Sequence, residues 1–174
     1  MGNHSFTIDA ASPADLPDVH TLIADLADYE GLTSICVATQ DDLARALFGD
    51  RRCAEALIAR VDGNPPIAAG FALFFHTYST FLGRRTLWLE DLFVRPEYRR
   101  NGLGRQLLAT LAALAVNREC GRFEWAVLDW NVSAIDFYQS LGAAVLPDWR
   151  IARVTGDALP RLAAGANASL QKEC

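Results

Sequence analysis

The stretch from Thr86 to Leu128 constrains the fold more than any other part of the chain. Residues 86–94 and 123–128 are mostly apolar and predict two strands. Between them a glycine-containing loop leads into a helix that ends near Asn117, and its apolar residues recur at helical spacing: Leu103, Leu107, Leu108, Leu111 and Leu114. A strand, a helix and a strand in succession predict a parallel pair with a right-handed crossover.

The other elements make this pair part of a larger sheet. In chain order we expect a strand at 6–8, a helix from Ser12 to about Gly31, a helix from Thr39 to Gly49, strands at 56–61, 67–77 and 86–94, the crossover helix, the strand at 123–128, a helix at 133–140 that stops at Gly142, and a last strand within 143–154. Three successive strands imply antiparallel pairing. The prediction is an α/β fold with a mixed, mostly antiparallel sheet flanked by helices. We expect one domain over residues 1–174, with its core at about 5–155 and a weakly patterned end at 156–174.

Composition and charge limit the partners. The chain has 174 residues, which suits one domain, and its 16 basic and 21 acidic residues give a net charge of -5. This balance disfavours nucleic acid and suits a cationic partner, although it is also a common setting for solubility. Residues 1–10 lack the features of a signal peptide, and no apolar run approaches the ~20 residues of a membrane span. We therefore expect no membrane partner and a cytoplasmic location. The four cysteines form no C-x-x-C pair and do not lie at metal-ligand spacing, so we expect reduced cysteines and no metal.

The loop before the crossover helix carries the strongest functional signal. It combines Gly102 and Gly104 with Arg99, Arg100 and Arg105. A helix start offers unpaired amides and partial positive charge, and glycines let the backbone approach an anion, so the loop suits a pyrophosphate. The chain lacks the third glycine of the dinucleotide fingerprint and the G-K-[ST] of a P-loop. The alternative is a surface turn whose glycines only allow the bend.

Here the sequence resembles a known family. Arg99-x-x-Gly102-x-Gly104 is similar to the [QR]-x-x-G-x-[GA] motif of the GCN5-related N-acetyltransferases, the GNAT superfamily. The segments Leu89–Val94, Trp130-Asn131, Phe137-Tyr138 with Gly142-Ala143, and Asp148-Trp149-Arg150 resemble its diamine (spermidine/spermine) branch.

The resemblance implies acetyl-CoA as the cofactor and a homodimer as the assembly. It also implies a bulge that splays the strand at 86–94 from its parallel neighbour and frees amides for the acetyl carbonyl and the pantetheine. The residues expected to bind the cofactor are Leu92, Phe93, Val94, Arg99, Arg100, Asn101, Gly102, Leu103, Gly104, Arg105, Asn131 and Tyr138.

Two acids in an apolar strand are candidates for proton transfer. An amine with a pKa near 10 is protonated at neutral pH and must lose a proton before it attacks a thioester, and partial burial would raise the pKa of Glu90 or Asp91 toward the working range. The resemblance implies that Glu90 is the base, whereas Asp91 contacts the amine or orients a neighbour. The alternative is that both acids pair with arginines such as Arg84 or Arg85.

The proton donor implied by the resemblance is Tyr138, which would protonate the sulfur of coenzyme A. A phenol stays protonated at pH 7, as this role requires. Without the resemblance, the sequence pattern favours Tyr138 as a core residue on the same helix face as Ile135. Asn131 reads equally as a helix cap or as a contact to the cofactor. The cysteines have no evident base, which favours direct transfer.

The expected acceptor is a small cationic amine: a polyamine, a diamine or a lysine-like amino acid. Its expected ligands are Asp28, Glu30, Glu90, Asp91 and Trp149, with Asp25 on the same helix face as Asp28. Two alternatives remain at this stage. The helix acids could form only a solvated face, and the fold could serve as a non-catalytic acyl-CoA-binding or partner-binding module.

Overall fold

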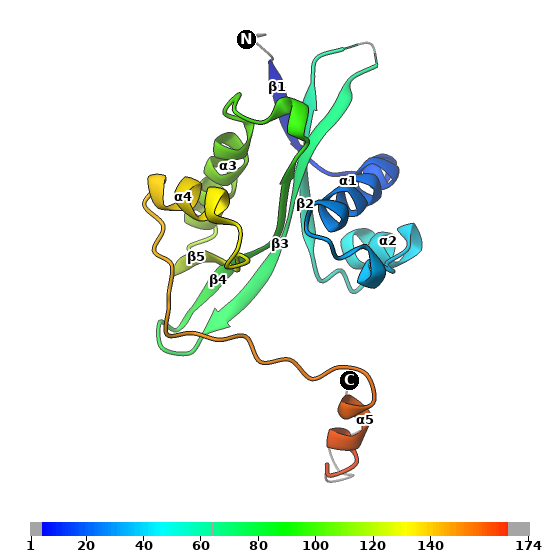
Figure 1. The fold of residues 1–174 in the computed structure, drawn as a ribbon, viewed down its shortest axis with the longest axis vertical. Coiled ribbons are helices and arrows are strands. Elements are labelled where there is room, and N and C mark those ends of the chain that lie inside the picture. Colours follow the sequence, from blue (N-terminus) through cyan, green and yellow to red (C-terminus); the bar gives the residue numbers. More distant parts are fainter. Residues whose placement is uncertain (1–4, 64, 167–174) are drawn as a thin grey trace. The chain divides into compact units, whose positions relative to one another are not determined.

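The computed structural model describes residues 5–63 and 65–166, which fall into two compact units divided between Ala126 and Val127 (Figure 1). The first unit contains, in order, β1 (Phe6–Ala10), α1 (Leu16–Tyr29), α2 (Gln40–Phe48), β2 (Glu55–Val61), β3 (Ile67–Ser79), β4 (Arg84–Val94), α3 (Leu103–Asn117) and β5 (Arg122–Trp125). The strands form one sheet in the order β1-β2-β3-β4-β5, in which only β4 and β5 are parallel. The predicted fold class is confirmed, as is the parallel pair of strands that α3 connects.

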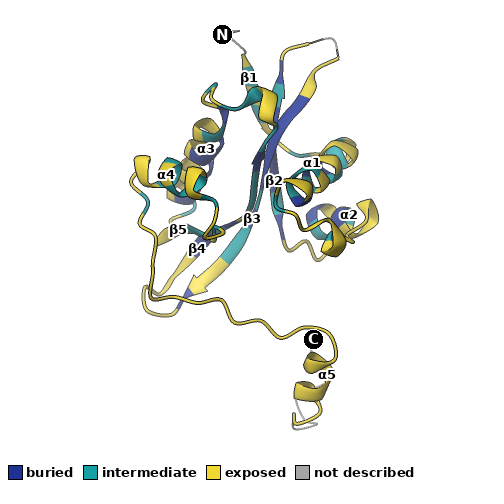
Figure 2. Cartoon of the chain, in the orientation of Figure 1, coloured by how far each residue is buried: buried dark blue, intermediate teal, exposed yellow. Residues whose placement is uncertain are grey.

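The two faces of the sheet are covered by different helices. Helices α1 and α2 lie on one face and α3 on the other (Figure 1). Burial is concentrated in the strands and on the helix sides that face them (Figure 2). The core beneath α1 contains Val19, Leu22, Ile58, Ala68, Phe71 and Phe93. Phe93 therefore fixes the carboxyl end of β4 against α1.

The helix starts follow from local chemistry. Ser12 and Asp15 form a capping box around a single 3-10 turn (Pro13–Asp15), after which α1 begins. Thr39 caps α2 by accepting a hydrogen bond of 3.2 Å from the amide of Asp42. Both predicted caps are confirmed, although the first one opens a 3-10 turn rather than α1 itself.

Strand β4 contains a bulge at Glu90. Leu73 of β3 pairs with Asp91, whereas the next residue, Phe74, pairs with Leu89, so Glu90 is the extra residue. Strand β5 pairs only with the first part of β4, from Thr86 to Leu89. It ends at Trp125, three residues earlier than predicted. Residues 90–94 of β4 thus have β3 as their only strand neighbour in the described sheet, as the expected splay requires.

The second unit contains α4 (Val132–Ser140) and α5 (Ala158–Ala163). Asn131 caps α4, and Gly142, with a φ of 91°, follows its end, as predicted. The last strand predicted within 143–154 is wrong, because residues 143–155 form no strand. Pro147 lacks an amide hydrogen, and Leu146, Trp149 and Ile151 are exposed, so this segment neither pairs nor buries a face. Part of the predicted weakly patterned end, residues 167–174, lies outside the described residues.

Candidate active site

The glycine loop is built from left-handed backbone. After a 3-10 turn (Pro96–Tyr98), Arg100 has a φ of 62° and Gly102, the N-cap of α3, has a φ of 83°. The side-chain amide of Asn101 closes the loop by donating to the carbonyls of Tyr98 (3.3 Å) and Arg99 (3.1 Å). Non-glycine residues at positive φ are strained and cluster at functional sites.

Past this turn, the loop opens α3. The first amides of a helix have no partner within it, so those of Leu103, Gly104 and Arg105 are available to an anion. Arg100 and Arg105 are exposed beside them. The described loop therefore fits a pyrophosphate.

Arg99 differs from the other two arginines of the loop. Its Nε donates a hydrogen bond of 2.8 Å to the carbonyl of Val94, and its guanidinium lies 4.5 Å from the ring centre of Tyr29 and 5.5 Å from that of Phe93. The guanidinium is thus engaged with the end of β4 and with the last turn of α1.

The bulge turns both acids of β4 toward α1. Asp91 lies opposite Leu73, which packs on the α1 and α2 core, so both residues share that face. Phe75, two residues after Leu73 in β3, lies on the same face and pairs with Trp88 of β4. The indole Nε1 of Trp88 donates a hydrogen bond of 2.9 Å to Glu90, which places Glu90 on this face as well. In a regular strand, adjacent acids would point to opposite faces.

Of the two acids in β4, Asp91 is the one whose pKa is raised. Burial, together with the charges of Glu90 and Glu30, raises the pKa of Asp91 from 3.8 to about 6. Burial also raises the pKa of Glu30 at the end of α1. Glu90 is exposed, so the burial argument made from sequence applies to Asp91 instead. Neither acid of β4 forms an ion pair with Arg84 or Arg85 in the described chain, which leaves that alternative without support.

A cavity of about 410 Å³ lies between α1 and the segment after β4. Its lining residues are Asp25, Asp28, Tyr29, Phe93, Arg95, Pro96, Glu97 and Arg99. Asp25 is paired with Arg95 (Oδ2 to Nε, 3.3 Å), whereas Asp28 is exposed. The sequence predicted the acids of α1 but missed Arg95 and Glu97 as lining residues. The pairing of Arg95 with Asp25 joins residues 70 positions apart, so no local spacing reveals it.

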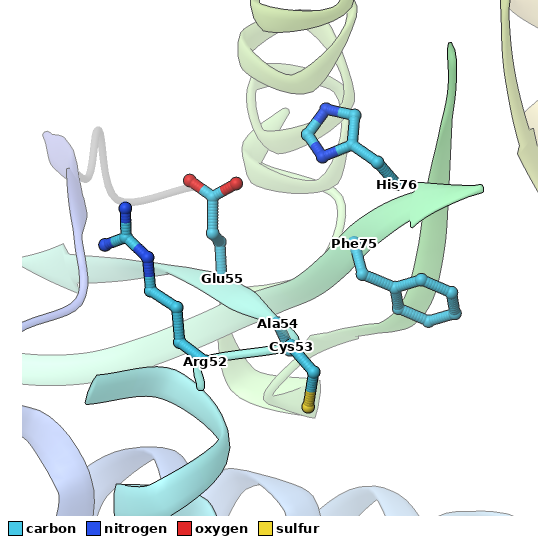
Figure 3. A pocket seen from close by; sticks show the side chains of 6 residues that line it. All are labelled: Arg52, Cys53, Ala54, Glu55, Phe75 and His76. Carbon is cyan, nitrogen blue, oxygen red and sulfur yellow. The ribbon is translucent and has the colours of Figure 1, made fainter. Parts of the chain in front are cut away.

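A second cavity, of about 220 Å³, lies where the start of β2 meets β3 (Figure 3). It is lined by Arg52, Cys53, Ala54, Glu55, Phe75 and His76. Glu55 is held by two hydrogen bonds from Arg118, which follows α3. Burial and the Arg118 charge lower the pKa of His76. No group of three or more metal-binding side chains occurs among the described residues, and Cys174 lies outside them.

Three predicted site residues lie in the second unit. Asn131 accepts a hydrogen bond of 3.3 Å from the amide of Ala134, which confirms its role as a helix cap. Tyr138 is half-buried on α4, as is Ile135, and its ring centre lies 5.5 Å from that of Phe137. Trp149 is 76% exposed. Their contacts to cofactor or amine stay predictions.

Comparison with known proteins identifies the family. Residues 21–143 match the model of the acetyltransferase (GNAT) family. The chain belongs to the GNAT family. It is 35% identical to L-ornithine N5-acetyltransferase NATA1 of Arabidopsis thaliana, over 91% of this chain and 88% of that one. It is also 35% identical to thialysine N-epsilon-acetyltransferase of Bos taurus, over 90% of this chain and 96% of that one.

A solved structure supports the fold as well. An integron cassette protein from the mobile metagenome of V. cholerae, 26% identical, superposes with a TM-score of 0.76 over 91% of this chain and 98% of that chain. As a GNAT member the protein is an N-acetyltransferase, and acetyl-CoA is the acyl donor of its family. No described helix is long and apolar enough to cross a bilayer.

Gly102→Val should weaken acetyl-CoA binding to this GNAT protein about tenfold or more, because a β-branched residue is strained at a φ of 83°. Space is not the obstacle, since the nearest atom to an added Cβ is Gln106 Nε2 at 3.9 Å. Gly102→Asn, which tolerates this conformation, should retain most of the affinity in calorimetric titration. Gly83→Val is the matched control, because Gly83 also has a positive φ and open space but lies in the β3–β4 turn. Wild-type affinity in both Gly102 variants would contradict the loop as the cofactor site.

Asp91→Asn should stabilise the fold above pH 6 by at most ~3 kcal/mol, the equivalent of a pKa rise from 3.8 to about 6. The carboxyl of Asp91 is neutral in both folded and unfolded chains below pH 3.8, so it then costs nothing. Its folded-state pKa is raised, so wild-type stability falls as the pH rises from about 4 to about 6 and stays lower above that. Urea unfolding from pH 4 to pH 8 measures the difference. Asp50→Asn, at an exposed site, is the control, and an equal pH dependence in wild type and Asp91→Asn would refute the assignment.

Proposed function

We propose that this protein transfers the acetyl group of acetyl-CoA directly to a small cationic amine: a diamine, a polyamine or a lysine-like amino acid. The observation that carries the proposal is the group of three carboxylates where β4 meets α1, in which the charges of Glu90 and Glu30 both act on the buried Asp91. Such a group attracts a cation and raises the pKa of its most buried member. The relatives named for ornithine and thialysine act on amines of this kind.

The raised pKa suits the first proton transfer. An ammonium near pKa 10 must lose a proton, and a carboxylate with a pKa of about 6 is a stronger base than an ordinary aspartate yet still ionised at pH 7.5. Burial and charge thus favour Asp91 as the proton acceptor. Glu90, the base implied by the resemblance, is exposed and held by Trp88, where it can contact the ammonium.

The transfer step itself needs an amine, a thioester and a proton donor. The amine nitrogen forms a bond to the acetyl carbon, the carbon–sulfur bond breaks, and the nitrogen gives up its second proton, which passes through solvent to the phenolate that the proton donor leaves behind. The sulfur leaves as a thiolate and takes a proton, for which we propose Tyr138. The edge of β4 beyond Leu89, which β5 does not cover, could offer amides to the acetyl carbonyl and pantetheine through Leu92, Phe93 and Val94.

Location and assembly belong to the same proposal. We propose a cytoplasmic protein that assembles as a homodimer and has neither nucleic acid nor membrane as a partner. Support comes from the net charge of -5 and the free thiols of Cys36, Cys53 and Cys120. The homodimer rests on the resemblance alone.

Thiol release from acetyl-CoA with a panel of amines tests the function. We expect kcat/KM to be at least tenfold higher for ornithine, thialysine, putrescine or spermidine than for propylamine, and to fall with ionic strength, because the carboxylates attract the second charge. Asp28→Asn should weaken the preference by raising KM. Asp9→Asn is the control, since Asp9 is exposed on β1, three strands from β4. Equal use of propylamine without a salt effect would contradict the acidic acceptor site.

Tyr138→Phe should lower kcat by about 10²–10⁴ without loss of acetyl-CoA affinity, because the thiolate would leave without a positioned acid. Single-turnover measurements ensure that the chemical step is observed. Tyr78→Phe, at a tyrosine 64% exposed on β3, should act like wild type. Near wild-type turnover in Tyr138→Phe would remove this tyrosine from the mechanism.

A further inference from the structure

Arg99 joins three parts of the chain that are distant in sequence. It is the first residue of the glycine motif, it bonds the Val94 carbonyl at the end of β4, and it lies over the Tyr29 ring at the end of α1. A planar guanidinium stacks on aromatic rings and donates in fixed directions, so these contacts set its orientation. Movement of the loop would therefore displace the ring of Tyr29.

Tyr29 lies beside the carboxylates of α1 that are proposed to bind the amine. Asp25, Asp28 and Tyr29 line the same cavity, and Glu30 follows at the helix end. Tyr29 is 41% exposed, so packing on the core restrains it only in part. The last turn of α1 is held by backbone bonds such as Leu32 N to Ala27 O at 2.7 Å.

The other arginines near the loop lack this combination of contacts. Arg95 precedes the glycine motif and pairs with Asp25 by charge. Arg100 and Arg105 are exposed, and among the described residues they form no ion pair and no ring contact with α1. Arg99 alone of the loop's arginines both belongs to the motif and lies over a ring of α1 in the described chain.

We propose that Arg99 is a positioning residue that couples the cofactor loop to the amine site. Binding of the pyrophosphate at the start of α3 orders the loop, the ordered Arg99 fixes Tyr29, and Tyr29 holds the last turn of α1 with its carboxylates. The inference rests on the proposed function, because it takes these carboxylates as the amine site. By linkage the effect is reciprocal, so the amine tightens coenzyme A binding by the same factor.

Calorimetry with coenzyme A and ornithine measures this coupling. We expect coenzyme A to tighten ornithine binding to wild type about tenfold, within the ~5–150-fold range of allosteric couplings. Arg99→Lys and Tyr29→Leu should reduce the factor below about twofold. Tyr29→Phe retains a ring and should preserve it. Arg105→Gln should weaken coenzyme A binding but leave the factor unchanged.

Hydrogen exchange gives a readout that needs no amine. Coenzyme A should slow exchange of the amides of Glu30, Gly31 and Leu32, which end α1, in wild type and Tyr29→Phe but not in Arg99→Lys or Tyr29→Leu. Absence of acetylation by wild type would refute the proposed function, whereas the exchange experiment would still decide the role of Arg99. A wild type without protection, or an Arg99→Lys variant with weaker coenzyme A binding and an intact factor, would overturn the proposal and make Arg99 a pyrophosphate ligand.

Discussion

The one-residue bulge in β4 is the constraint on which the site depends. Without it, Glu90 and Asp91 would point to opposite faces of the sheet, and only one could lie near α1. With Glu90 as the extra residue, both lie on the face that carries α1, where Glu30 also ends that helix. The repulsion that Glu90 and Glu30 exert on Asp91 follows from this change of register.

The rest of the first unit keeps this arrangement in place. Phe93, two residues after Asp91, is buried in the α1 core and anchors the free end of β4. On the other face, α3 buries Leu103, Leu107 and Leu111. The fold thus holds a strand that is bulged and half-released from its neighbour between two packed layers.

The sequence predicted the parts of the fold that depend on local chemistry. The caps at Ser12 and Thr39 and the length of α3 were all foreseeable, because caps and helical periodicity are short-range signals. The prediction of a last strand was wrong because a strand, unlike a helix cap, depends on residues that are distant in sequence. Apolar residues near Leu146 resemble a strand, but a strand also needs a neighbouring edge, and Pro147 with its exposed neighbours has none in the described unit.

The site was predictable only in part, for a similar reason. The glycine loop was predicted from its glycines, its arginines and the helix that follows, and the bulge came from the family resemblance. The choice between Glu90 and Asp91 depends on cross-strand neighbours that no local pattern reveals. The stacking of Arg99 on Tyr29 joins residues 70 positions apart and was equally hidden. Sequence therefore identified the residue types of the site, and the structure determined which of them are buried.

The burial of Asp91 lowers the stability of the fold, which supports a functional role for this carboxylate. A carboxylate with a raised pKa opposes folding at neutral pH, because the charged form is worse accommodated in the folded chain than in water. Among the described residues, the charges that act on Asp91 are those of two further acids, and no cation relieves the repulsion. An asparagine would avoid this cost while preserving the shape. A bound ammonium would relieve it too, and the binding energy of the amine would then include the repulsion that it removes. The same repulsion therefore lowers the stability of the protein without a bound amine and strengthens its binding of a cation.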